Sequence, residues 1–400
     1  MRVRRILSGA VGVMGLAAIM VFGAAASSSA SPTKAHAAAA CNASIAIEAP
    51  YATGPATQLG LEQLHFAELA VAMANKANHT NITLGKDDTG LNPSLATTRT
   101  NSIIASSAVA AVGPAGSQEV EAVGPLYAKA GMAFVSGSAT LPALATSGAN
   151  KTFFRVVPND DIQGPNDAHY IINHKLAPAG STILIIDDEE AYSEGLVAVM
   201  TPILQAAGYT VNHQSYNGTD TGATLQSDLS SLATSQVTAN THLVIVPWQS
   251  AGNAQQFGQT LQQQGKKVTL FGTDGTDSPG QFVIPGTYVS NFGPDISSSK
   301  SALAKSIVSG VKKYGPYGSF GVPTWEATTV VMDAVASVCK SGKTPSRANV
   351  LAAVRKTNIP ASKSAMGVPI QFAANGNLVA KAGYLFHINS KGAYIEIPDK

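Results

Sequence analysis

The chain has 400 residues, of which 45% are hydrophobic and only 12% charged, a composition typical of a globular protein rather than a disordered one. A chain of this length exceeds one ordinary core and favours two domains. The first 37 residues contain four basic residues and no acidic ones, which leaves 22 of the 26 basic residues against 24 acidic ones, a net charge of −2. That balance excludes a basic field for nucleic acid or an anionic membrane.

The first 37 residues have the pattern of an export signal. Arg2, Arg4 and Arg5 precede a long run of apolar and small residues, and a Ser-rich stretch leads to Ala35-His36-Ala37, an A-x-A cleavage pattern. We therefore expect a signal peptide over residues 1–37, export, and cleavage near Ala37. The alternative is an uncleaved membrane anchor, since the apolar run is nearly long enough to span a bilayer. Its many glycines and alanines make it weakly apolar, which favours cleavage.

The sequence contains two cysteines, Cys41 and Cys339. Export permits a disulfide, and we favour a bridge between these two residues. Cys41 follows four alanines, so it is alternatively a lipid-carrying residue at a lipoprotein cleavage site. Against lipidation, residues 32–36 separate it from the apolar run, and alanine rather than leucine stands three residues before it.

The first half of the chain alternates strand and helix patterns. We predict strands over 44–49, 82–88, 108–114 and 133–138, and helices over 61–77, 92–106 and 117–131. Short loops rich in Gly and Pro separate them. Such alternation predicts a parallel sheet with helices on both faces.

The alternation starts again beyond 154–165. We predict strands over 181–188, 209–216, 241–248 and 267–275, and helices over 193–208, 221–234 and 253–265. Helical segments at 324–342 and 348–357 complete the first unit if the chain crosses back. We therefore predict an α/β protein of two Rossmann-like lobes with parallel sheets, joined by three crossings. Lobe 1 is expected over 42–158 and 292–366, and lobe 2 over 159–291 and 367–400.

Three of the predicted strands end in loops suited to a charged ligand: 113–117, 136–140 and 271–276. In open parallel sheets, ligands bind at the carboxyl ends of the strands. Ser117 and Thr140 are candidate N-caps, where hydroxyls and free N–H groups attract an anion. Asp274 is suited to accept hydrogen bonds from an ammonium. Each is an ordinary cap or turn when taken alone, but together they suit an α-amino acid.

Seven segments in this order resemble the periplasmic solute-binding proteins of branched-chain amino acid ABC transporters. The resemblance covers about residues 43–390, and its segments are TGPATQLG (53–60), VGPAGS (112–117), VSGSATLPAL (135–144), FFRVVPNDDIQGP (153–165), DDEEAYSEGL (187–196), LFGTDG (270–275) and AMGVPIQFAANGNL (365–378). The fold that it implies is the type I periplasmic binding fold, which agrees with the two predicted lobes.

The resemblance also implies ligand-binding residues. Ser117 and Thr140 would hold the ligand carboxylate, while the Ser138 carbonyl, Thr140 and Asp274 would take the ammonium, with Ala139 in the same loop. Further ligand contacts are expected from Tyr192, from Trp248 or the neighbouring Gln249, from Leu59 and from Trp325. Leu59 replaces a common aromatic residue, Gly116 a hydroxyl or cysteine, and Asp274 a glutamate. These departures affect the specificity for the ligand side chain more than the amino-acid class.

Catalysis has no support in the sequence. G-x-S-x-G, Walker, H-E-x-x-H and C-x-x-C motifs are absent. His169 and His174 are five residues apart, which makes a poor metal pair on a helix. We expect a non-enzymatic protein without cofactor or metal.

The resemblance implies the extracytoplasmic solute-binding component of an ABC importer, with two partners: a small-molecule ligand, expected to be an amino acid, and a membrane permease. The alternatives are a ligand sensor and a binder of amides, urea-like compounds or aromatic acids.

Overall fold

The computed structural model describes residues 41–397, which lie in one compact unit, Ala40–Lys400. The expected signal peptide and its cleavage site lie outside the described residues. Within residues 41–397, no helix combines the length and apolar character needed to cross a membrane.

The first sheet is parallel and five-stranded, with the order β2-β1-β3-β4-β5. Its strands are β1 (Cys41–Ala49), β2 (Thr80–Asp88), β3 (Ala108–Val112), β4 (Ala133–Ser136) and β5 (Phe153–Arg155). The order reverses between β1 and β3, which is the switch point where such sheets place ligands.

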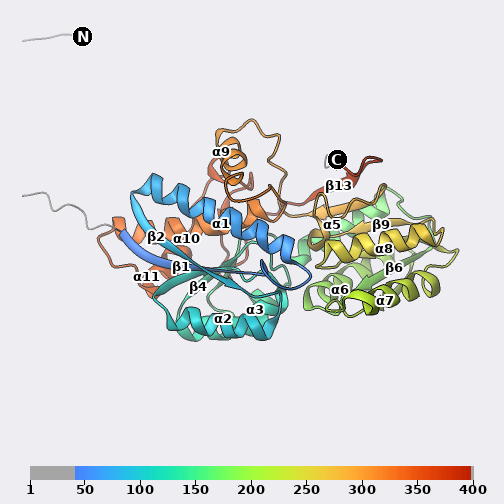
Figure 1. Cartoon of the computed structure of the whole chain (residues 1–400), viewed down its shortest axis with the longest axis horizontal. Helices are drawn as coiled ribbons and strands as arrows, with labels where there is room; N and C mark the ends of the chain where they lie inside the picture. Colours follow the sequence, from blue (N-terminus) through green and yellow to red (C-terminus); the bar gives the residue numbers. More distant parts are fainter. Residues whose placement is uncertain (1–40, 398–400) are drawn as a thin grey trace, which may run out of the picture. The chain divides into compact units, whose positions relative to one another are not determined.

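Helices cover both faces of this sheet, as the sequence predicts (Figure 1). One core cluster contains residues of α1 (Thr57–Asn78) and α10 (Gly321–Lys340), and the other contains residues of α2 (Pro93–Ala105) and α3 (Ser117–Ala130). The short α4 (Ala143–Thr146), α9 (Ala302–Val311), α11 (Arg347–Val354), β11 (Asn358–Ile359) and β12 (Ile370–Gln371) complete lobe 1.

The second sheet has seven strands in the order β14-β13-β10-β9-β8-β6-β7. The strands are β6 (Thr182–Asp187), β7 (Thr210–Ser215), β8 (Thr241–Val246), β9 (Thr269–Gly272), β10 (Tyr288–Asn291), β13 (Tyr384–Ile388) and β14 (Tyr394–Ile397). Helices α5 (Asp160–Asn173) and α6 (Ala191–Ala206) pack on one face, and α7 (Gly222–Ser235) and α8 (Ala251–Gln263) on the other. This sheet and these helices form lobe 2.

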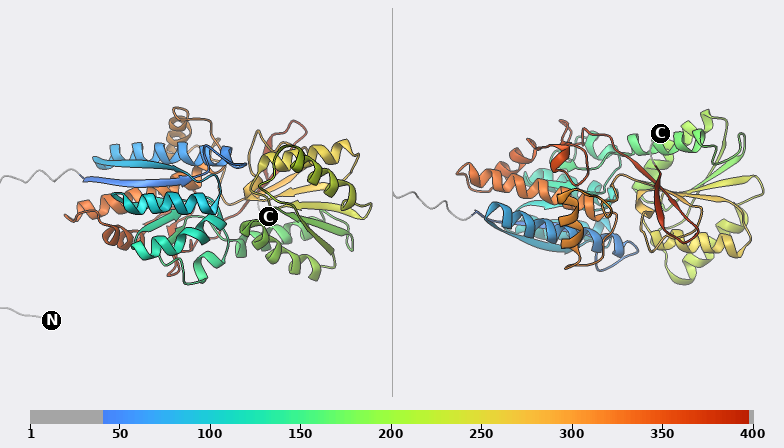
Figure 2. Two further views of the ribbon diagram at one scale, coloured as in Figure 1. Left: turned by 60° about the horizontal axis from the view of Figure 1, so that its bottom comes forward. Right: turned by 90° about the horizontal axis from the view of Figure 1, so that it is seen from above.

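The sheet of lobe 2 is mixed, whereas the sequence predicts parallel sheets. Strand β13 runs antiparallel to both β10 and β14. Figure 2 shows this C-terminal hairpin, in red, against the second sheet. A two-strand hairpin needs only a tight turn between its strands, and the residues Asn389–Gly392 supply it.

The last crossing between the lobes comes later than the expected boundary at residue 367. Ile370 and Leu378 lie in the core of lobe 1. The turn before Leu378 also packs on the edge strand β5, since Arg155 N–H donates to the Gly376 carbonyl at 3.1 Å. Residues 367–378 therefore belong to lobe 1, and the chain crosses to lobe 2 between them and β13.

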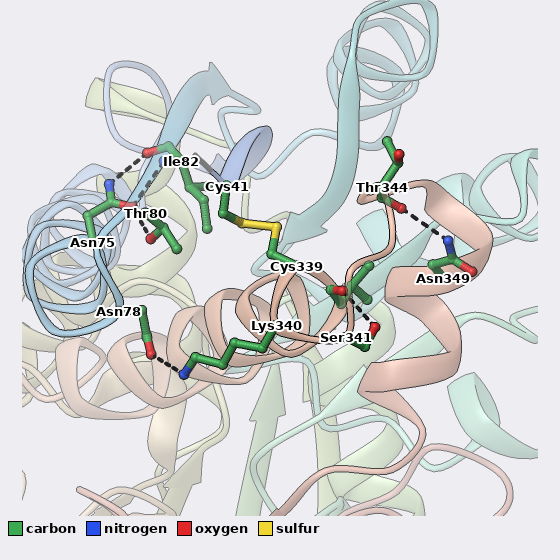
Figure 3. The surroundings of a disulfide bond; sticks show 11 residues. Cys41, Asn75, Asn78, Thr80, Ile82, Cys339, Lys340, Ser341, Thr344 and Asn349 are labelled. Carbon is green, nitrogen blue, oxygen red and sulfur yellow. Dashed lines mark hydrogen bonds between the residues drawn. A yellow bond between two sulfur atoms is a disulfide. The ribbon is translucent and has the colours of Figure 1, made fainter. Parts of the chain in front are cut away.

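A disulfide joins Cys41, the first residue of β1, to Cys339 near the end of α10 (Figure 3). The two residues are 298 positions apart in the sequence. Beside the disulfide, Lys340 donates to the Asn78 amide oxygen at 2.7 Å. The disulfide ties the amino end of β1 to α10, and the Lys340 contact ties α10 to the end of α1, both at the end of β1 remote from its ligand loop.

Candidate functional site

A pocket lies where strands of both sheets end. Its cavity volume is only about 20 Å³, and it is lined by Leu59, Leu91, Ala115, Ser117, Ser138, Tyr192, Gln249, Asp274, Gly275 and Phe320. Apart from Phe320, these residues follow β1, β2, β3, β4, β6, β8 and β9, so the pocket occupies the position that parallel sheets reserve for ligands. Five of the expected residues line it: Leu59, Ser117, Ser138, Tyr192 and Asp274.

Ser117 provides a hydrogen-bond donor at the start of α3. Gly116, not Ser117, is the N-cap residue, and the Gly116 N–H donates to the Glu119 carboxylate at 2.8 Å. The Ser117 oxygen accepts from Leu141 N–H at 3.2 Å, so its own proton remains free to donate. The expected cap is therefore wrong by one residue, but the hydroxyl still faces the pocket at a helix N-terminus.

Thr140 is fully buried just behind the pocket. It does not cap α4, whose N-cap is Pro142, because the helix begins two residues later than expected. The Thr140 carbonyl accepts from Asp160 N–H at 3.1 Å. Its hydroxyl lies beside the Asp160 carboxyl and lowers the pKa of that carboxyl.

The loop between Ser138 and Leu141 is held from within the protein. The Ser138 hydroxyl donates to the Ala115 carbonyl and accepts from Gln63, both at 2.9 Å. Ala139 donates to Ser136 and accepts from Arg155, so its polar groups are already used. Ala139 does not line the pocket, in contrast to the expectation.

The acidic side of the pocket is built around Asp274. Tyr192 donates to its carboxylate at 2.6 Å and lies 2.7 Å from the Thr273 hydroxyl. The Gly275 N–H donates to the Tyr192 oxygen at 3.1 Å. A Cβ at Gly275 would come within 2.3 Å of the Trp248 carbonyl, so only glycine permits this turn to pack so closely.

Burial raises the pKa of Asp274 to about 6, although the Tyr192 hydroxyl and the Gln163 amide oppose that rise. Its neighbour Asp160 is also fully buried. Burial, and then the charge of Asp274, raises the pKa of Asp160 to about 8, although the Thr140 hydroxyl and the buried Arg155 guanidinium oppose that rise. Two buried carboxyls therefore lie close together behind the site, with Arg155 near one of them.

Asp160 is a residue that the sequence reasoning missed. The signal was present, because Asp160 lies within the FFRVVPNDDIQGP segment that resembles the family. It is the first residue of α5, immediately after the first crossing between the lobes. The resemblance identifies this segment as a crossover and gives no direction for its side chains.

Gln118, which the sequence reasoning also missed, pairs with Gln249 and so joins the two lobes across the pocket. Gln118 of α3 donates to the Gln249 side chain at 2.8 Å, and Gln249 donates back at 3.3 Å. Asp188 fixes the backbone of Gln249 by accepting its N–H at 2.8 Å. The sequence left open whether Trp248 or Gln249 faces the ligand. Gln249 lines the pocket and Trp248 does not.

Trp248 and Trp325 do not line the pocket, and their expected ligand contacts are wrong. Trp248 lies in the core of lobe 2, where its indole N–H donates to the Ile186 carbonyl at 2.6 Å. Trp325 lies in the core of lobe 1. The apolar lining comes instead from Leu59, together with Leu91 and Phe320, which the sequence reasoning did not identify.

The described residues contain no group of three or more His, Cys, Asp or Glu side chains arranged to hold a metal ion. The site is therefore polar at one end, acidic at the other and apolar between them. A small molecule with a carboxylate, an ammonium and an apolar part matches this arrangement.

The model of one protein family, described as periplasmic binding protein, matches residues 44–393. The chain belongs to the periplasmic binding protein family. The family that the sequence resembles is thereby confirmed, and membership indicates an exported protein.

One curated protein similar to this chain is the leucine-, isoleucine-, valine-, threonine- and alanine-binding protein of Pseudomonas aeruginosa. It is 28% identical over 170 residues, which are 42% of this chain and 44% of the relative. The chain thus aligns to less than half the length of that relative.

Solved structures of periplasmic binding proteins match most of the chain. One is the branched-chain amino acid transporter substrate binding protein LivJ of Streptococcus pneumoniae in complex with isoleucine, with a TM-score of 0.74 and 20% identity over 89% of this chain and 100% of that one. A second is a solute binding protein of R. palustris in complex with benzoate, with a TM-score of 0.73 and 18% identity. The match covers 88% of this chain and 95% of that one. These matches confirm the predicted type I fold.

Proposed function

We propose that this protein captures an amino acid, branched-chain or related, between its two lobes and delivers it to the permease of an ABC importer. The observation that carries the proposal is the pairing of a free Ser117 hydroxyl at the start of α3 with the buried Asp274 in one pocket. A donor for a carboxylate and an acceptor for an ammonium on opposite lobes match the two ends of a zwitterion.

The acidic surroundings of the pocket support the same ligand. The buried Asp160 carboxyl lies behind Asp274 and adds a second acid near the proposed ammonium site. A ligand ammonium supplies three donors, and Asp274 and Thr140 are the acceptors proposed for it, with the Ser138 carbonyl. Leu59, Leu91 and Phe320 then surround the ligand side chain.

Capture proceeds by closure of the lobes. Ser117 lies on lobe 1 and Tyr192, Gln249 and Asp274 on lobe 2, so a ligand completes its contacts only when the lobes meet. Such contacts shift the equilibrium between open and closed forms toward the closed form. The closed form docks on the permease, after export of the chain and cleavage near Ala37.

The test is a binding titration of ligand-stripped protein, residues 38–400, with leucine, isoleucine, valine and the other amino acids. We expect at least one of these amino acids to raise the melting temperature, since a ligand of the native state stabilises it. Asp274→Asn keeps the shape of the side chain but removes its charge, and we expect it to abolish most of that rise. Gln226→Ala, on the outer surface of lobe 2, serves as the control.

Failure of every amino acid to bind would overturn the proposed ligand class. A panel of amides, aromatic acids and fatty acids then tests the other ligand classes, and one similar solved structure is in complex with benzoate. Binding of an amino acid that Asp274→Asn leaves unchanged would retain the class but remove Asp274 from the ammonium site.

A further inference from the structure

A second cavity, of about 340 Å³, lies where the chain crosses between the lobes. Pro158 of the first crossing contributes to its wall, as do Asn291 and Phe292 at the second crossing and Ala382 and Gly383 at the third. It shares no lining residue with the ligand pocket. We call it the hinge cavity. Because all three crossings form its walls, its shape depends on the angle between the lobes.

A short chain of hydrogen bonds runs along the wall of the hinge cavity. Gln163 donates its amide N–H to the Ser290 hydroxyl at 3.1 Å, and Ser290 donates to the Asp167 carboxylate at 2.8 Å. A serine has one hydroxyl proton, and Asp167 receives it, so the Gln163 amide must present its N–H to Ser290. The side-chain carbonyl of Gln163 is therefore the group left over.

Both ends of this chain are unfilled acceptors. The Gln163 side-chain oxygen has no partner, and none of the residues 41–397 donates to the second oxygen of Asp167. The two side chains are more than nine-tenths buried and line the hinge cavity. Their spacing of four residues places them on one face of α5, one turn apart. The cavity wall thus lacks donors rather than acceptors.

The charges around the hinge cavity also favour a cation. Asp167 and Glu396 line it, and no lysine or arginine does. Tyr170, Tyr384 and Phe292 add aromatic surface, which attracts cations through the ring faces. The imidazoles of His169 and His174, both exposed, also line the cavity, and His174 stacks on Tyr170.

We propose that the hinge cavity is a second ligand site, which binds a small organic cation that carries a primary ammonium group. The ammonium donates to the oxygen of Asp167 that Ser290 leaves free, and the organic part packs against Tyr170 and Tyr384. A charged hydrogen bond to a buried carboxylate is among the stronger contacts available to such a ligand. The cavity volume lies within the range of small-molecule sites.

Helix α5 connects the hinge cavity to the ligand pocket. Asp160, Gln163 and Asp167 follow the i, i+3, i+7 spacing of one helix face, and Asp160 lies beside Thr140 at the pocket end. A cation bound between the crossings stabilises the lobe angle at which the cavity has this shape. By linkage, it changes the affinity of the pocket for its ligand by the same factor that the ligand changes the affinity for the cation.

Benzylamine is a suitable probe, since it combines a primary ammonium with a ring. We expect calorimetric titration to detect its binding to the wild-type protein, and Asp167→Asn to weaken that binding at least tenfold. Gly383→Leu provides a second variant that leaves all charges in place. A Cβ at Gly383 meets only the Asn166 amide nitrogen, at 3.5 Å, so the larger side chain can enter the cavity and block it.

Leu59→Trp separates the two sites, because Leu59 lines only the ligand pocket and the larger side chain fills that pocket with all charges in place. Benzylamine binding that persists in Leu59→Trp and is lost in Gly383→Leu supports the hinge cavity. Binding that is lost in Leu59→Trp and kept in Gly383→Leu would locate the amine in the ligand pocket and overturn the proposal. So would the absence of benzylamine binding at millimolar concentration. Circular dichroism checks that each variant is folded. If Asp167→Asn does not fold, the result for Gly383→Leu decides the test.

Discussion

Gln118 and Gln249 exchange two hydrogen bonds, at 2.8 and 3.3 Å, across the mouth of the pocket. Gln118 belongs to the first turn of α3 in lobe 1, and Gln249 follows β8 in lobe 2. The pair therefore forms only when the lobes are closed, and it contributes to closure without being part of the acidic site.

Gln118→Ala is expected to weaken ligand binding about fivefold, the equivalent of one net hydrogen bond of roughly 1 kcal/mol. The physical reason is that the variant loses a contact of the closed form and keeps the ligand contacts of Ser117 and Asp274. Calorimetric titration with the bound amino acid measures the change. Gln226→Ala is the matched control, because it removes an amide pair of 2.7 Å between Gln226 and Gln256 within lobe 2. Equal affinities for the two variants would contradict a role of the pair in closure.

Ligand affinity is expected to fall at acidic pH. The ammonium of the ligand pairs with ionised Asp274, whose pKa burial raises to about 6 in the free protein. Binding favours the carboxylate, so affinity is constant well above pH 6 and decreases below it, toward tenfold per pH unit. Titrations at pH 5, 6 and 7.5, in buffers of different ionisation enthalpy, measure both the affinity and the proton released.

Asp274→Asn should bind weakly and without the loss below pH 6. A second acid beside the pocket is Asp160, whose pKa burial raises to about 8. Repeating the titrations with Asp160→Asn separates the two groups. If affinity still falls at acidic pH in Asp274→Asn but no longer does so in Asp160→Asn, the ammonium pairs with Asp160, and our assignment of Asp274 is wrong.

The sequence predicted the loops of the pocket because their signal is local. Ser117, Ser138 and Asp274 each follow a short apolar strand, and the carboxyl ends of parallel strands meet at one edge of a sheet. The direction of a side chain is a finer property. Successive residues of an extended chain point to opposite sides, so Trp248 enters the core while Gln249 faces the pocket.

Long-range pairing was less accessible to the sequence. The hairpin of β13 and β14 joins the second sheet beside β10. The sequence of residues 384–397 contains no signal that identifies β10 as its partner. The later position of the last crossing follows from Ile370 and Leu378, whose burial depends on the edge of lobe 1. Gln118 and Asp160 were missed because each acts through a residue distant in the chain, Gln249 in one case and Thr140 in the other.

Replacing both cysteines by serine is expected to destabilise the protein by about 2–5 kcal/mol, because the disulfide closes a loop of 298 residues in the unfolded chain. Ligand affinity should change little, since Cys41 begins β1 and the pocket lies at the other end of that strand. Denaturant unfolding gives the first quantity and titration the second. A thiol assay on the denatured, unreduced protein should find no free thiol. Two free thiols, or a lipid mass on Cys41, would contradict the bridge.

Stability is expected to decrease as pH rises from about 5 to 8, and Glu48 gives the clearest test. It is fully buried in lobe 1, where Thr100 and Tyr127 donate to it at 2.6 and 2.8 Å. Burial raises its pKa to about 8, from an ordinary value of 4.5, despite these hydrogen bonds. The folded protein therefore holds one more proton than the unfolded chain between these values. Its stabilising contribution is complete below about pH 4.5 and is lost as pH rises through 8.

Glu48→Gln keeps the shape of this buried side chain and removes its titration. We expect its melting temperature to match the wild type near pH 5 and to exceed it near pH 8.5, because the amide never has to ionise in the core. Denaturation at both pH values measures the difference.

A smaller dependence of stability on pH should remain in the variant, since burial also raises the pKa values of Glu62 and Glu326 to about 7. Glu189→Gln, on the surface of lobe 2, is the control and should leave the slope of the wild type unchanged. If Glu48→Gln and Glu189→Gln have the same pH dependence, Glu48 is ionised in the folded protein and the hydrogen bonds outweigh its burial.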